Sequence, residues 1–309
     1  MEKRILIAVD GSIYSRKAIE YTVKMESVIK DLKYFLINIQ PKISEFLVDD
    51  AKIDPKARAA LKKVVSKNQT NAMKILDESK AIMTKLGVDE KQIETSTQPV
   101  VRGTAKGILD YGKQSLCDAI VLGRRGISRL AEAFTGSVTN SVLEHTSTTP
   151  VWAIGGDIKS SKIMVAIDGS ESALGALDHV IFMVGENPEI QITLLHVTPR
   201  LRDYCTIEFD DKKDNLEEII AQGDKRCVES FYNHAQQKFE EAGLKKNQIE
   251  INQVSSTLNI GKTIVDEAKK GNFGTIAVGR RGANNSFFMG SVSRHVLTNA
   301  LDCAVWLVP

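Results

Sequence analysis

The chain has 309 residues, a length typical of about two globular domains, and its 42% hydrophobic content is that of an ordinary globular protein. Its net charge of +2 comes from 41 basic and 39 acidic residues, so charge gives no reason to expect nucleic acid or an anionic membrane as partner. Four cysteines without CxxC spacing and five scattered histidines argue against a disulfide framework and a zinc site. No membrane span and no signal-peptide pattern is predicted at the start, and we expect a cytoplasmic protein with reduced thiols.

Apolar runs alternate with helical patterns through the first half of the chain. Runs rich in β-branched residues predict strands at 5–9, 34–39, 119–122 and 151–154. Helices are predicted at 14–26, 56–86, 104–115 and 137–145. Continuous apolar runs are typical of strands that are buried on both faces of a parallel sheet. The alternation therefore predicts a doubly wound α/β fold, in which ligands bind beyond the carboxyl ends of the strands.

The second half of the chain repeats the first. The strand that leads to Asp10 returns before Asp168, and Trp152 near the end of the first half returns as Trp306. Repetition at this length predicts two copies of one Rossmann-like α/β domain. A short polar linker at 155–161 separates the copies and gives domains 1–156 and 157–309.

A glycine-rich loop follows the strand at 119–122. It begins with Gly123-Arg124-Arg125-Gly126, and nine residues later Gly136-Ser137 opens a helix. Glycines in such a turn can take positive φ and expose successive N–H groups, while a helix N-terminus favours phosphate. The hydroxyl of Ser137 can add a contact, and Thr139 lies close by. Glycines also make turns and helix starts without any ligand. The prediction of a phosphate-binding loop therefore depends on the combination of these residues and on its duplication.

Asp10 and Asp168 each follow the first strand of their repeat. A carboxylate at that place faces the expected crevice and can accept a hydrogen bond from an exocyclic amine such as that of adenine, or help to hold a cation. An N-cap of the next helix is an alternative of equal weight, because Asp before a helix accepts backbone N–H bonds.

The arginines of the two glycine loops have three candidate roles. They could neutralise a triphosphate, for which the planar guanidinium is suited. They could also be solvated or make interface contacts. Side chains in such turns often point outward, so we favour solvent or interface roles for most of the set Arg124, Arg125, Arg280 and Arg281.

With these motifs the chain resembles the tandem, two-domain members of the universal stress protein family. ATP-binding members of that family carry the pattern G-2x-G-9x-G-(S/T), which the first loop matches residue by residue. The resemblance implies that Asp10 contacts adenine and that the backbone near Ile39 pairs with the base. It implies that the ribose and phosphates are surrounded by Gly123, Gly126, Gly136, Ser137 and Val138.

The second half departs from that pattern. Its corresponding positions are Asp168, Val197, Gly279, Gly282, Gly290, Ser291 and Val292. Only seven residues separate Gly282 from Gly290, and Asn259 stands where the first half has Gly103. We expect the second loop to clamp more closely, to accept a shorter nucleotide such as AMP or ADP, or to stay empty.

The resemblance also implies pairing through the last strand of each half. The runs at 151–154 and 305–308 are apolar edges, and exposed edges invite pairing. Joined within one chain they would form an intramolecular pseudo-dimer, and a homodimer of the whole chain is a further alternative.

Three functions compete on these observations. The leading hypothesis is a cytoplasmic stress-response protein that binds ATP, with little or no hydrolysis. Mg²⁺ could accompany the phosphates. The protein would act as a sensor or regulator of an unidentified protein partner. A second is a nucleotide-free interaction scaffold. A third, a slow ATPase or nucleotidyl transferase, is disfavoured because the chain has no P-loop, no GxGxxG and no catalytic base that can be named.

Overall fold

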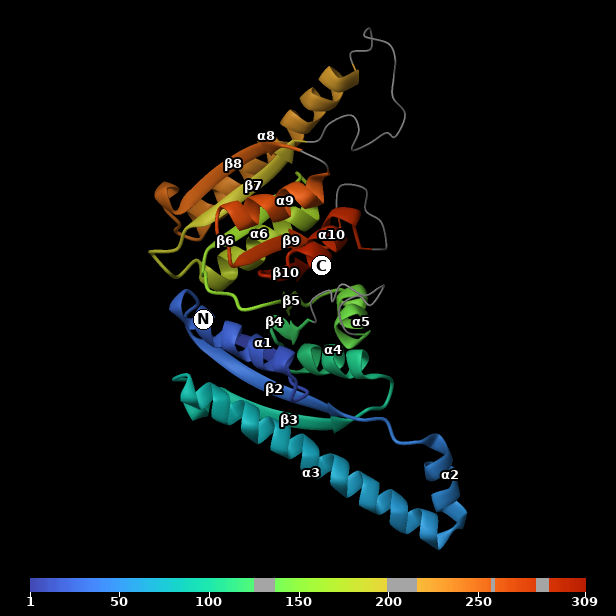
Figure 1. Cartoon of the computed structure of the whole chain (residues 1–309). Helices are drawn as coiled ribbons and strands as arrows, with labels where there is room; N and C mark the ends of the chain where they lie inside the picture. The colour runs from blue at the N-terminus through green and yellow to red at the C-terminus, as the bar shows by residue number, and fades with distance from the viewer. Residues whose placement is uncertain (125–136, 199–215, 257–258, 282–288) are drawn as a thin grey trace.

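A computed structural model describes residues 1–124, 137–198, 216–256, 259–281 and 289–309. The strands of the first half are β1 (Lys3–Ala8), β2 (Leu32–Gln40), β3 (Ile93–Pro99), β4 (Ala119–Gly123) and β5 (Val151–Ile154). Those of the second half are β6 (Ile163–Ile167), β7 (Ile192–Thr198), β8 (Ile249–Ser255), β9 (Thr275–Gly279) and β10 (Ala304–Val308). Together they form one sheet in the order β3-β2-β1-β4-β5-β10-β9-β6-β7-β8 (Figure 1).

The helices of the first half are α1 (Ile13–Lys24), α2 (Glu45–Ile53), α3 (Pro55–Lys85), α4 (Thr104–Gln114) and α5 (Ser137–His145). In the second half the described helices are α6 (Glu171–Val184), α8 (Leu216–Glu241), α9 (Ile260–Lys270) and α10 (Ser291–Asn299). Short 3-10 turns lie at Met25–Ser27, Glu90–Gln92 and Lys246–Gln248. None of the described helices is long and apolar enough to cross a membrane.

Helices cover both faces of the sheet. One core cluster joins the sheet to α1, α3, α6 and α8, and it includes Ile19, Leu76, Val180 and Phe231. The other cluster, on the opposite face, joins the sheet to α4, α5, α9 and α10. Because both faces are covered, the central strands are apolar throughout, as the sequence predicts.

The two halves meet through β5 and β10, which pair antiparallel while every other strand pair in the described sheet is parallel. Trp152 and Trp306 lie directly opposite each other in this register. The predicted intramolecular pairing of the last strands is confirmed.

A buried aromatic cluster fills the seam between the halves, and we call it the seam cluster: Trp152, Trp306, Tyr21 and His179. The two indoles stack with ring centroids 4.0 Å apart and planes 2° apart. Trp152 Nε1 donates to His179 Nε2 at 3.0 Å, and Trp306 Nε1 donates to the Tyr21 hydroxyl at 2.9 Å. Tyr21 and His179 occupy corresponding positions of the repeat, so each helix satisfies one indole across the pseudo-twofold axis.

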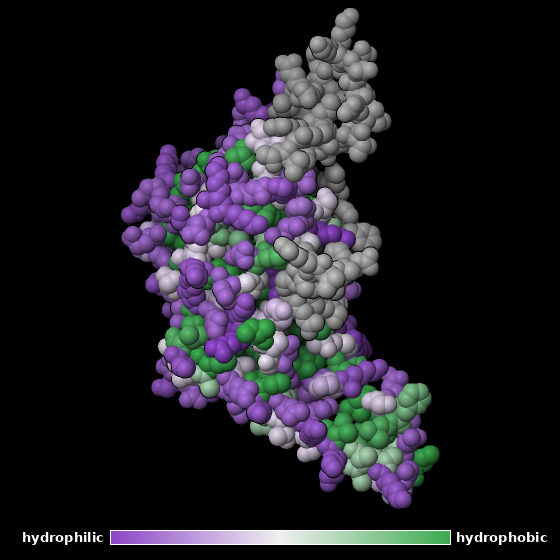
Figure 2. Space-filling view, in the orientation of Figure 1, coloured by the Kyte–Doolittle hydropathy of each residue, from purple (hydrophilic) through white to green (hydrophobic). Residues whose placement is uncertain are grey.

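Two elements of the first half were not located from the sequence. Strand β3 is polar, because it is an edge strand that pairs with β2 alone and is mostly exposed. Helix α2 forms a hairpin with the long α3, which begins at Pro55 after the side chain of Asp54 accepts a hydrogen bond from Lys56 N. Figure 2 shows apolar side chains gathered on this hairpin, where Phe46 and Ile53 are each 84% exposed.

Candidate functional site

A cavity of about 190 Å³ lies at the carboxyl ends of β1, β2 and β4. Its buried apolar lining includes Ile37, Ile108 and Leu122. The predicted residues Asp10, Ile39, Gly123 and Val138 all line it. Strand β1 lies between β2 and β4. The helix that follows β1 and the helix that precedes β4, α1 and α4, cover opposite faces of the sheet. The cavity therefore occupies the switch point, where such sheets bind ligands. We call it the Asp10 cavity.

Asp10 is placed by the turn between β1 and α1. Gly11 takes a positive φ of 76°, and the Ser12 backbone N–H donates to Asp10 Oδ1 at 3.0 Å. The N-cap of α1 is Ser12, whose side chain accepts from Ser15 N. The alternative that Asp10 caps the helix is therefore wrong. Its carboxylate holds the turn and lines the cavity.

The environment of Asp10 favours its ionised form. Burial of the carboxyl group acts to raise its pKa, but hydrogen bonds from Ser12 and Ser15 act in the opposite direction and leave the pKa below its usual value. A carboxylate with a lowered pKa accepts hydrogen bonds at neutral pH and is a weak general base.

Gly123 is required by close packing. A Cβ at this position would overlap the backbone carbonyl of Tyr14 at the start of α1. Neither Gly123 nor Gly279 has positive φ, so close packing rather than a left-handed backbone requires glycine at the first position of the loop. The Thr139 hydroxyl donates to Gly123 O at 3.0 Å, which ties α5 to the end of β4.

The second half repeats this arrangement with changes. Asp168 Oδ1 accepts from Ser170 N at 3.1 Å and from the Ser170 hydroxyl at 2.6 Å. His196 replaces Asn38 at the corresponding position on the second strand, and each contacts the last carbonyl before the aspartate turn. An imidazole thus stands beside the Asp168 turn where the first half has an amide.

The remaining predicted residues of the second half lie at the same edge of the sheet. Val197 lies on β7 and Gly279 ends β9, while Gly290, Ser291 and Val292 surround the start of α10. Gly290 N–H donates to Arg280 O at 2.9 Å, so this amide is already used within the loop. The Ser293 hydroxyl donates to Gly279 O at 2.7 Å, as Thr139 does in the first half.

Part of both loops lies outside the described residues. This holds for Gly126, Gly136, Gly282 and Arg125. Ser137 begins α5, but its side chain is not described.

Arg124 and Arg280 point into the interface between the halves. Arg124 is fully buried and donates to the main-chain oxygens of Leu297, Ala300 and Cys303 at the end of α10. Arg280 donates to Glu144 O near the end of α5, at 2.5 Å. The interface role is therefore confirmed for both arginines. Each binds carbonyl groups that the C-terminus of a helix leaves without partners.

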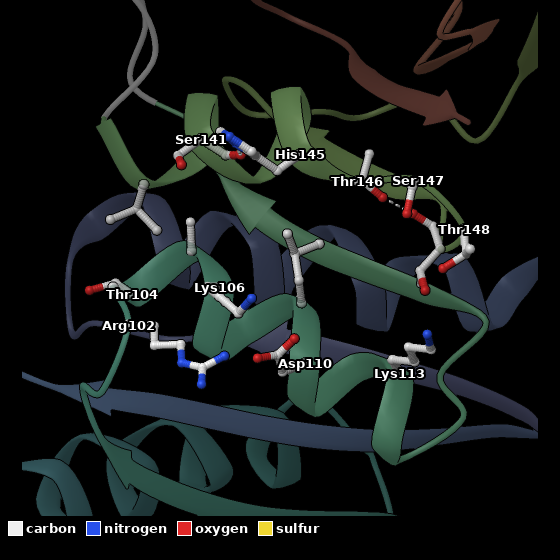
Figure 3. A pocket seen from close by; sticks show the side chains of 15 residues that line it. Arg102, Thr104, Lys106, Asp110, Lys113, Ser141, His145, Thr146, Ser147 and Thr148 are labelled. Atoms are coloured by element: carbon white, nitrogen blue, oxygen red, sulfur yellow. Dashed lines mark hydrogen bonds between the residues drawn. The ribbon is translucent and has the colours of Figure 1, made fainter. Parts of the chain in front are cut away.

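A larger groove adjoins the Asp10 cavity and was not predicted. It has a volume of about 680 Å³, lies between α4 and α5, and shares Thr104 and Val138 with the cavity. Figure 3 shows Arg102, Lys106, Asp110 and Lys113 along the α4 side. On the other side lie Ser141, His145 and the turn that holds Thr146, Ser147 and Thr148. The only sequence signal at this place is the change from Gly103 to Asn259 between the halves.

Within the described part of the chain, no three His, Cys, Asp or Glu residues come together as a metal site. Cys117 and Cys303 are buried free thiols. Burial raises the pKa of Cys117 to about 12, so this thiol is protonated and inert at neutral pH.

The fold and the repeat define a tandem pair of Rossmann-like α/β units. The model of the universal stress protein family matches residues 1–155 and again residues 159–309. The chain belongs to the universal stress protein family.

One curated protein and two solved structures illustrate what the chain is similar to. Universal stress protein YxiE of Bacillus subtilis (strain 168) is 29% identical over 158 residues, which span 49% of this chain and 97% of that protein. The crystal structure of a universal stress protein from Archaeoglobus fulgidus DSM 4304 covers 99% of this chain and 97% of its own, at 20% identity and a TM-score of 0.62. A family member from Arabidopsis thaliana, solved with AMP bound, is 18% identical over 49% of this chain and 90% of its own, with a TM-score of 0.34.

Proposed function

We propose that this stress protein binds ATP in its first half and acts as a cytoplasmic sensor or regulator with little or no hydrolysis. The observation that carries the proposal is the meeting of Asp10, Ile39, Gly123 and Val138 around one cavity at the switch point of the sheet. These residues come from separate parts of the chain. The glycine motif selects Gly123 and the repeated aspartate turn selects Asp10, while Ile39 and Val138 are implied by the family resemblance.

The cavity suits the base of an adenine nucleotide. The Asp10 carboxylate can accept a hydrogen bond from the exocyclic amine of adenine, while the main chain at Ile39 offers a donor and an acceptor to the ring edge. The buried side chains of Ile37, Ile108 and Leu122 give the ring an apolar floor. The free N–H groups at the start of α5 favour the phosphates.

The described groups around the cavity support the proposal of binding without efficient hydrolysis. Asp10 is the carboxylate that lines the cavity, and its lowered pKa makes it a poor proton acceptor at neutral pH. The Thr139 hydroxyl is already bound to Gly123 O. No described group near the cavity is placed to activate a water molecule, which supports a role in sensing.

We propose that the second half is the weaker site. His196 stands where the first half has the smaller Asn38, and the Gly290 amide is taken by Arg280 O. The first feature places a larger side chain beside the Asp168 turn, and the second leaves this amide unavailable to a phosphate chain.

The test compares Asp10→Ala with Asp168→Ala by calorimetric titration of ATP. Wild-type protein should bind about one equivalent tightly, and Asp10→Ala should weaken that binding about tenfold or more, since it removes a hydrogen bond to a charged group. Asp168→Ala should leave the tight site unchanged and serves as the matched control.

Thermal unfolding of each variant checks that the fold is intact before titration. The proposal fails if wild-type protein does not bind ATP, or if Asp168→Ala removes the tight site while Asp10→Ala keeps it.

A further inference from the structure

The groove between α4 and α5 is continuous with the Asp10 cavity. Thr104 and Val138 line both spaces, and each stands at the N-terminal end of its helix. A ligand seated in the cavity can therefore extend between these two helix ends into the groove. At about 680 Å³ the groove is within the size range of ligand sites, whereas the cavity of about 190 Å³ holds only a part of a nucleotide.

The groove is electropositive. Arg102, Lys106 and Lys113 line it with a single carboxylate, that of Asp110, and His145 stands at its far end. None of the three cations forms an ion pair with a residue in the described part of the chain. The His145 ring donates through Nδ1 to Ser141 O at 2.7 Å, so it adds no negative charge.

The second half satisfies the corresponding groups differently. Lys262, which corresponds to Lys106, forms an ion pair with Asp266 at 2.5 Å. Asp110 stands in the same i, i+4 relation to Lys106, but no ion pair joins these two side chains among the described residues. Asn259 Oδ1 accepts from Lys262 N at 2.7 Å and caps α9, whereas Gly103 brings no side chain to the start of α4.

The residues that face each other between these helices differ between the halves. A Cβ at Gly261 would overlap His295, so the backbone of α9 packs directly against this side chain of α10. In the first half the corresponding residues are Ala105 and Ser141, and both line the groove. The second half thus has an imidazole in contact with α9 where the first half has a small serine beside open space.

We propose that the α4/α5 groove of the first half is a second anion subsite, which takes a chain of phosphates that extends from a nucleotide in the Asp10 cavity. This inference rests on the proposed function and adds the residues that select for phosphate number. Arg102 and Lys106 line the groove at its mouth and act on the first phosphates to enter it. Lys113 lies about 10 Å further along α4, so the groove accepts a chain longer than a single phosphate.

The ligand class follows from the groups present. Guanidinium and ammonium groups, hydroxyl groups and an uncapped helix N-terminus together favour phosphate oxygens. A nucleoside monophosphate would fill the cavity and leave the groove empty. The first half should therefore prefer ATP over AMP.

The test titrates AMP and inorganic tripolyphosphate separately into wild-type protein, Lys106→Gln and Lys262→Gln. The two variants remove the same charge from exposed, corresponding positions, so they control for overall electrostatics. We expect Lys106→Gln to weaken tripolyphosphate binding about threefold to tenfold, the effect of one charge-assisted contact at a partly exposed site. Lys262→Gln should leave it unchanged, and neither variant should change AMP affinity. The double variant Arg102→Gln/Lys106→Gln should lose more than Lys106→Gln alone.

The outcomes separate this inference from the proposed function. Loss of tripolyphosphate binding in Lys106→Gln supports the subsite, whether or not AMP binds to the wild-type protein. Failure of AMP to bind would count against the adenine site alone. Equal tripolyphosphate affinity in Lys106→Gln and Lys262→Gln overturns the subsite, as does tripolyphosphate that fails to bind wild-type protein while AMP binds.

Discussion

Arg124→Ala is expected to lower the free energy of unfolding by about 3–5 kcal/mol, because it removes three hydrogen bonds from a buried charged donor together with the packing of a large side chain. Arg124 is fully buried and supplies donors to three carbonyl groups at the end of α10. Alanine leaves those oxygens buried without donors and opens a cavity. Burial lowers the pKa of Arg124 to about 10, which shows that desolvation of the cation offsets a part of its contribution.

Urea denaturation, followed by circular dichroism, measures this effect. Arg280→Ala is the matched control, because Arg280 holds the corresponding position but donates to one carbonyl among the described residues, that of Glu144. It should cost about 1–2 kcal/mol. A loss for Arg124→Ala that does not exceed the loss for Arg280→Ala would contradict the role assigned to the three carbonyl contacts.

The free energy of unfolding should also fall by about 2 kcal/mol between pH 7 and pH 5 because of His179, which binds a proton in the unfolded chain only. Burial lowers the pKa of this imidazole from 6.5 to about 3, and the ring accepts a hydrogen bond from Trp152 in its neutral form. In the unfolded chain the ring binds a proton below pH 6.5, while in the folded chain it does not. The contribution is therefore fully present above pH 6.5 and is lost as the pH falls toward 3.

Unfolding curves of wild-type protein and His179→Gln at pH 7 and pH 5 test this expectation. Glutamine keeps a hydrogen-bond acceptor but cannot be protonated, so the difference between the two pH values should shrink by about 2 kcal/mol. His234→Gln removes an exposed histidine on α8 and should retain the wild-type difference. Tryptophan fluorescence reports on the same transition, because Trp152 and Trp306 are the two tryptophans of the chain and both are fully buried. An unchanged pH dependence in His179→Gln would refute the assignment.

The parts of the fold that follow from the sequence are those buried on both faces. Strands β1, β4 and β5 are continuous apolar runs, and the repeated tryptophans lie in the strands that pair. Strand β3 and helix α2 escaped prediction because each is largely exposed, so burial does not constrain their residues to an apolar pattern.

The part of the candidate site that follows from the sequence consists of residues in recognisable motifs at the ends of strands. Asp10, Ile39, Gly123 and Val138 line a common cavity as the motif suggests, and their part in ligand binding stays a prediction. The Arg102 and Lys106 groove was missed because exposed basic residues on a helix have no distinctive spacing. The change from Gly103 to Asn259 indicated a difference between the halves, but only the packing of His295 against Gly261 shows how the helices of the second half meet.

The antiparallel pairing of β5 with β10 has a consequence for how the two halves can differ. In an association of two identical chains, every substitution at one site appears at the other. Here one chain supplies both partners, so corresponding residues can differ. Lys262 forms an ion pair while Lys106 forms none among the described residues, and one indole donates to Tyr21 while the other donates to His179. The covalent link breaks the symmetry without loosening the pair. Each half can therefore change residue by residue while the shared sheet keeps both in place.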